Sequence, residues 1–152
     1  MSVEAGGIVT DFLKLLAIKV ETMKAQAICC ILNLDQMAIK AAYVYNAHTQ
    51  SYCGTITVPL AKNEIKKKIK MNGKYEEDKE LAYHAMSIVL VGMSALENGK
   101  PWKQFIGCQL TGHSFDADFV ANWVVQVIEK VTEVGLNVKG VTMDNSPSNV
   151  AV

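Results

Sequence analysis

The sequence predicts an α/β domain built on one mixed sheet. Two apolar runs that each end on an aspartate, residues 29–35 and 138–144, have the composition of buried strands. Between them, two more apolar runs flank a turn and precede a long amphipathic stretch typical of a helix. A helical crossover returns the last strand parallel to an earlier one, so this order of elements favours a mixed sheet.

The first expected elements are a helix and a central strand. Residues 8–24 place apolar side chains at helical spacing, with Thr10 or Asp11 near the start. Residues 27–39 are almost wholly apolar, which predicts a strand buried on both faces, interrupted by Asn33 and Asp35. We therefore divide the chain into an N-terminal helix at residues 1–24 and a domain at residues 25–152.

A hairpin and an insertion are expected next. Residues 41–58 alternate aromatic and polar side chains around a turn at residues 46–50, which is typical of a hairpin. Residues 61–80 carry a lysine run and an acidic run, and this composition buries little surface. We expect a solvated insertion loop with some helix there.

The second half of the chain predicts a hairpin, a helix and a strand. Residues 85–96 and 102–110 are strand-like runs on either side of a turn that contains Gly99 and Pro101. Ser114 or Asp116 can cap a helix that runs to Val134, and residues 138–143 return to strand. Ser146-Pro147 predicts the start of a further helix.

Composition limits the classes of function. The 152 residues are 50% hydrophobic, which favours one globular domain, and 15 basic residues balance 15 acidic ones. All the basic residues are lysines, so the chain lacks the planar guanidinium group with which arginine recognises guanine edges. We therefore do not expect sequence-specific recognition of DNA. No apolar stretch approaches the roughly 20 residues of a membrane span. The four cysteines lack zinc-site spacing, so we interpret them as small buried apolar residues. We expect a soluble intracellular protein without a membrane partner.

Asp35 and Asp144 are the candidate site residues. A carboxylate at the end of an apolar strand is costly to desolvate unless something binds it, and two carboxylates together favour a divalent cation. If the two strands are neighbours, both side chains emerge at the carboxyl edge of the sheet, where open α/β sheets bind ligands. Strand-end aspartates also serve as turn formers or helix caps, and Asp144-Asn145-Ser146-Pro147 suits a cap as well.

Five segments of the chain together resemble a known family. They are LNLDQMAI, SIVLVGMSAL, KPWKQFIGCQL, FVANWVVQVIEKVTEVG and VKGVTMDNSPSN. In this order they are similar to the RNase H-like catalytic domain of P-element-type transposases, including those that carry a THAP zinc finger. The resemblance covers about residues 25–152, and it implies an RNase H-like mixed sheet in β-β-β-α-β-α order that is incomplete at its C-terminal side.

The resemblance implies metal-dependent DNA cleavage and strand transfer in the nucleus. The first catalytic acid of the family corresponds to Asp35 and the second to Asp144, and both would bind Mg²⁺ or Mn²⁺. The family's third acid lies beyond a GTP-binding insertion, and these 152 residues offer no position for that acid, the insertion or the N-terminal finger. We therefore expect a weak or incomplete metal site and no sustained hydrolysis by this chain alone.

Three other interpretations stay open at this point. The chain could be a non-enzymatic interaction or regulatory module that associates with itself or with full-length transposase relatives. It could be an unrelated α/β protein that binds a small molecule at the carboxyl edge of its sheet. It could also be a fragment without a stable fold, because the sheet strands that would complete the family's domain are not in this sequence.

Overall fold

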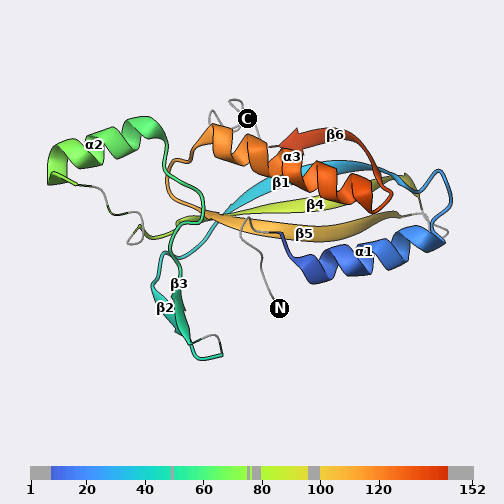
Figure 1. Ribbon diagram of the computed structural model, residues 1–152, viewed down its shortest axis with the longest axis horizontal. Coiled ribbons are helices and arrows are strands. Elements are labelled where there is room, and N and C mark those ends of the chain that lie inside the picture. Colours follow the sequence, from blue (N-terminus) through green and yellow to red (C-terminus); the bar gives the residue numbers. More distant parts are fainter. Residues whose placement is uncertain (1–7, 49, 75, 77–79, 96–99, 144–152) are drawn as a thin grey trace.

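A four-stranded mixed sheet is the centre of the molecule (Figure 1). The computed structural model describes residues 8–48, 50–74, 76, 80–95 and 100–143. The sheet has the strand order β5-β4-β1-β6. Its strands are β1 (Cys29–Ala38), β4 (His84–Ala95), β5 (Pro101–Thr111) and β6 (Asn137–Met143). The predicted α/β class with one main mixed sheet is confirmed.

The pairing of these strands follows the predicted order of elements. β4 and β5 form the expected antiparallel hairpin, and β4 also pairs antiparallel with β1. Helix α3 (Ala117–Glu133) then carries the chain across the sheet, so that β6 lies parallel to β1. The two strands that lead to the predicted site residues are therefore direct neighbours.

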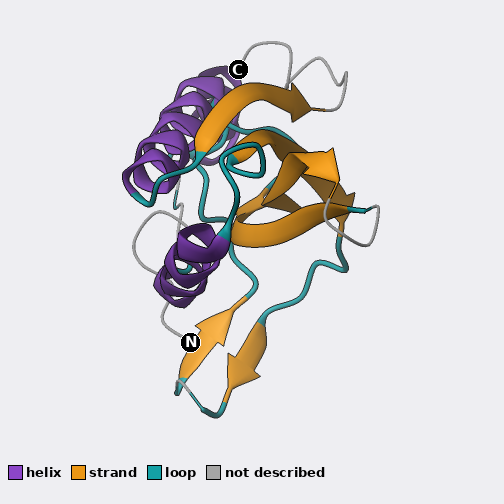
Figure 2. Ribbon diagram, turned by 90° about the vertical axis from the view of Figure 1, so that its right-hand side faces the viewer, coloured by secondary structure: helices purple, strands orange, loops and turns teal. Residues whose placement is uncertain are grey.

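β1 differs from the prediction in two ways. Its core face is fully buried, with Cys30, Leu32 and Leu34 exposed by 0, 0 and 2%, whereas the residues between them are only half-buried. The prediction of a strand buried on both faces was wrong, because α1 and α3 both lie on one side of the sheet (Figure 2). β1 also continues to Ala38, since its pairing with β4 extends to that residue, so Asp35 lies within the strand.

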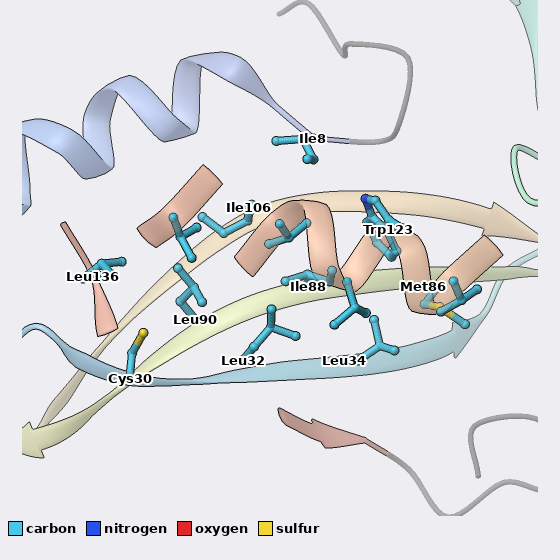
Figure 3. Packing of buried hydrophobic residues seen from close by; sticks show 14 of the residues in the cluster. Ile8, Cys30, Leu32, Leu34, Met86, Ile88, Leu90, Ile106, Trp123 and Leu136 are labelled. Atoms are coloured by element: carbon cyan, nitrogen blue, oxygen red, sulfur yellow. The ribbon is translucent and has the colours of Figure 1, made fainter. Parts of the chain in front are cut away.

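Helix α3 supplies the largest part of the core against the sheet. Asp116 caps its start, because the carboxylate accepts hydrogen bonds from the backbone nitrogens of Asp118 and Phe119 at 3.0 and 3.4 Å. The side chains that point at the sheet recur at helical spacing, and Figure 3 shows Trp123 among the core residues of β1, β4 and β5. The buried residues of α3 are Val120, Trp123, Val124, Val127 and Val131.

The N-terminal helix α1 (Thr10–Thr22) belongs to the same core. Leu16 is completely buried in the main apolar cluster, and the ring of Phe12 meets that of Phe105 edge-on at 5.5 Å. Leu15 and Ile18 remain exposed, so only a narrow stripe of the helix packs. α1 therefore closes the core beside β5.

Trp102 fixes the geometry of the β4–β5 hairpin near the connection between its two strands. Its side chain lies over Gly92, where an added Cβ would come within 2.4 Å of the indole nitrogen. The same nitrogen donates a hydrogen bond of 2.8 Å to the carbonyl oxygen of Ala27. The indole thus packs under the hairpin and also holds the segment that enters β1.

Two segments lie between β1 and β4. The first is the predicted hairpin, formed by β2 (Val44–Asn46) and β3 (Ser51–Cys53). The second is helix α2 (Lys62–Asn72), which occupies much of the predicted insertion loop. Both extend from the body at the same end of the sheet (Figure 1). A small second cluster formed by Ile56, Leu60 and Ala82 anchors them, with Ile65 of α2 packed against it.

Among the described residues, no helix is long and apolar enough to cross a membrane. The predicted helix at Ser146-Pro147 lies outside the described residues.

Candidate metal site at the carboxyl end of the sheet

The alternation of β1 decides where Asp35 points. Leu32 and Leu34 are buried in the core, and successive side chains of a strand alternate between faces. Asn33 and Asp35 therefore lie on the opposite face, which no described helix covers (Figure 2). Asp35 is exposed, and its backbone pairs with Ser87 of β4, whose hydroxyl lies 3.5 Å from the Asp35 carbonyl oxygen.

The carboxylate of Asp35 is available to a ligand. Within the described part of the chain it takes part in no hydrogen bond or ion pair, while its backbone is paired with Ser87 of β4. A carboxylate on a rigid strand needs little reorganisation to bind a hard cation, since oxygen ligands are what Mg²⁺ and Mn²⁺ prefer. The donor chemistry at this position fits a divalent metal.

A polar pair on the same face joins the two strands just before the candidate ligands. Thr142 Oγ1 of β6 donates a hydrogen bond of 3.1 Å to Asn33 Oδ1 of β1. The last paired residues of the two strands are Leu34 and Met143. The Asn33–Thr142 pair thus holds the parallel register of β1 and β6 one residue before their paired ends.

Asp144 directly follows Met143 in the sequence and lies outside the described residues. The structure therefore brings together the two strands that carry the predicted ligands, and it describes Asp35 itself. In the described ranges, no three His, Cys, Asp or Glu side chains lie close enough to one another to hold a metal ion.

The core face beneath Asp35 supports the strand without taking part in metal binding. Gln36, the next residue, points away from Asp35 because side chains alternate along a strand, and it donates a hydrogen bond of 3.0 Å to Thr111 Oγ1 on β5. Cys30 is buried, and burial, with a smaller effect of Cys29, raises the pKa of its thiol to about 11. A thiol that stays protonated at neutral pH is a structural residue and a poor nucleophile.

The four cysteines are less uniform than the sequence suggested. Only Cys30 is buried, whereas Cys29 and Cys108 are half-buried and Cys53 on the β2–β3 hairpin is exposed. The interpretation of all four as buried apolar residues was wrong for Cys53. None of the four is in a disulfide.

The sequence signalled one supporting residue and missed its partner. Asn33 stands out as a polar residue in an apolar run, which indicates that something must satisfy its amide. Thr142 gives no such signal, because threonine is common in strands and its hydroxyl needs no special site. Only the parallel pairing of β1 with β6 brings the two side chains together.

Comparisons with known proteins agree with this fold. A chain of the Drosophila P element transposase strand transfer complex has a similar structure, with a TM-score of 0.60 and 16% sequence identity. The similarity covers 95% of this chain and 24% of that chain, so the chain spans about a quarter of its structural relative. No curated protein matches the sequence. The model of the TNP-like RNase H N-terminal domain matches residues 5–152. The chain therefore belongs to the TNP-like RNase H N-terminal domain family, which confirms the predicted transposase-type RNase H-like fold.

Proposed function

We propose that this chain is the part of a transposase RNase H-like domain that supplies two ligands, Asp35 and Asp144, to a divalent metal. Asp35 and Asp144 would hold the Mg²⁺ or Mn²⁺, and the ion would supply Lewis-acid chemistry for cleavage of a DNA phosphodiester. DNA cleavage and strand transfer would be the activities, and the nucleus would be their place in the cell. The proposal draws on family membership and on the sheet geometry.

The observation that carries the proposal is the parallel pairing of β1 with β6. Their register continues to Leu34 and Met143, the residues directly before Asp35 and Asp144. Neighbouring strands lie about 4.8 Å apart and consecutive Cα atoms about 3.8 Å apart. Those distances allow two carboxylates, one from each strand, to reach a common ion.

Each residue near the site has a role in this proposal. Asp35 offers an exposed carboxylate on a strand fixed from both sides, and Asp144 offers the second. Asn33 and Thr142 hold the register on which the separation of the two carboxylates depends. With two of the family's three acids assigned, we expect weak metal binding and no sustained hydrolysis by these 152 residues alone.

Isothermal titration of Mn²⁺ into the folded protein tests the proposal. We expect wild type to bind weakly and both Asp35→Asn and Asp144→Asn to lose the heat of binding. Asp118→Asn is the matched control, because this exposed carboxylate belongs to α3 and lies outside the proposed site. Circular dichroism must show that all four proteins are folded. Equal binding by wild type and Asp35→Asn would contradict the proposal.

One observation also favours a second candidate, a module that associates with another transposase domain. The face of the sheet opposite the helices carries Met93, exposed by 56%, next to half-buried Val91 and Val89 on β4. A second RNase H-like domain could cover this apolar surface. Light scattering as a function of concentration tests self-association, and Met93→Lys should then favour the monomer.

A further inference from the structure

Charge is unevenly distributed along a chain whose net charge is zero. Residues 36–75 contain a single acid, Glu64, and seven lysines, so this segment is strongly positive and the rest of the chain is correspondingly negative. The lysines are Lys40, Lys62, Lys66, Lys67, Lys68, Lys70 and Lys74. In the described part of the chain, two acids that follow this helix pair with lysines of the segment, Glu80 with Lys68 and Glu76 with Lys74.

Helix α2 places four of its five lysines on one side. Lys62, Lys66 and Lys70 follow one another at intervals of four residues, which puts their Cα atoms about 6 Å apart along one side of the helix. Lys67 lies next to this row. We call these four residues the basic face of α2, and all four are exposed.

The other side of α2 attaches the helix to the rest of the domain through an apolar contact and an ion pair. Ile65 packs against the second apolar cluster. Lys68, on the same side, forms an ion pair with Glu80. The helix is thus fixed from one side while its basic face points to solvent.

Few carboxylates compete for the basic face. Lys67 pairs with Glu64 at 2.8 Å, where the hydrogen bond from the ammonium group lowers the pKa of the carboxyl, and Lys62 pairs with Asp118 at 3.6 Å. In the part of the chain that the structure describes, Lys66 and Lys70 have no acidic partner. Exposed ion pairs are weak, so a phosphate can replace either carboxylate.

We propose that the basic face of α2 binds the phosphate backbone of duplex DNA beside the Asp35 site. The choice of DNA as partner rests on the proposed function. α2 lies at the end of the sheet where β1 ends, so DNA at the site can reach it (Figure 1). A row of ammonium groups without arginine neutralises phosphates and reads no bases, so the contact is independent of DNA sequence.

The salt dependence of DNA binding tests this surface. Affinity for a random-sequence duplex is measured by fluorescence anisotropy in EDTA, so that metal binding plays no part. Each phosphate contact contributes about 0.9 to the slope of log affinity against log salt, so Lys66→Gln/Lys70→Gln should lower that slope by about 1.8. Between about 50 and 200 mM salt, wild type should then lose roughly tenfold more affinity than the variant.

A matched variant distinguishes an effect of the basic face of α2 from an effect of the total charge of the protein. Lys14→Gln/Lys19→Gln removes the same charge from α1 and should leave the slope unchanged. An equal effect of both pairs, no effect of either, or binding of wild type to phosphatidylserine vesicles but not to DNA would overturn the inference. If wild type binds Mn²⁺ at Asp35 but does not bind DNA, this inference alone is overturned, whereas DNA binding by a wild type that does not bind Mn²⁺ would overturn the proposed metal site alone.

Discussion

Replacing Gly92 by alanine tests whether Trp102 fixes the hairpin to the start of β1. An alanine Cβ at this position would lie 2.4 Å from Trp102 Nε1, 2.5 Å from Cδ1 and 2.9 Å from Cε2. Ordinary contacts between such atoms are about 3.5–4.0 Å, so the indole must shift by about 1 Å. Because the same nitrogen donates the 2.8 Å hydrogen bond to Ala27, the shift also strains that bond.

The expected cost follows from these two effects. Overpacking of a core costs about 1–3 kcal/mol. A buried donor that loses its acceptor costs about 1–3 kcal/mol more. We therefore expect Gly92→Ala to lower the free energy of unfolding by about 2–6 kcal/mol, which for a chain of this size lowers Tm by roughly 4–24 °C.

Urea unfolding followed by far-UV circular dichroism measures this change. Gly140→Ala in β6 is the matched control, because an added Cβ there meets no atom within 4 Å. A second test is the double variant Gly92→Ala/Trp102→Phe, in which the smaller ring leaves room for the methyl group. The double variant should lose less stability than the sum of its single changes. Equal stability of the two alanine variants, or strict additivity in the double variant, would refute the reasoning.

Other predictions concern the N-terminal helix, the cap of α3 and the cysteines. Leu16→Ala should lower the free energy of unfolding by about 2–5 kcal/mol because its side chain is fully buried, whereas Leu15→Ala, at 52% exposure, should change it little in the same urea assay. Asp116→Ala removes the acceptor at the start of α3 and should cost about 1 kcal/mol in thermal melting. Iodoacetamide at pH 8 should label exposed Cys53 first and buried Cys30 only after unfolding, as read by mass spectrometry. The pKa of folded Cys30, about 11, lies above its ordinary value of 9.0, so the unfolded chain loses this proton first. Stability should therefore fall as pH rises from 9.0 to about 11, and Cys30→Ala should show a smaller fall.

The order of elements was predictable because each one leaves a local pattern. The stripe that ends in Val131 of α3 follows helical spacing, and Asp116 stands where a cap is needed. The turn with Gly99 and Pro101 marks the β4–β5 hairpin, and one crossover helix before β6 requires a parallel strand. Periodicity and turn residues act over a few positions, so they can be recognised in the sequence without the structure.

The bounds of β1 and its burial were not predictable in this way. An apolar run can be buried on one face or on both, and the placement of α1 and α3 on one side of the sheet decides the matter. Asp35 looked like the end of its strand because a charge interrupts the apolar run. The strand continues because β4 supplies pairing partners as far as His84.

The sequence by itself determined the α/β class, the family resemblance and the identity of Asp35 and Asp144 as candidates. Only the tertiary structure decided that β6 lies beside β1, that Thr142 bonds Asn33, and that the basic face of α2 is exposed while Lys68 pairs with Glu80. The physical reason is the distance along the chain over which each property is set. Side-chain chemistry and periodicity are local properties of the chain, whereas strand neighbours and charged faces depend on contacts between residues far apart in sequence, such as the 109 positions that separate Asn33 from Thr142.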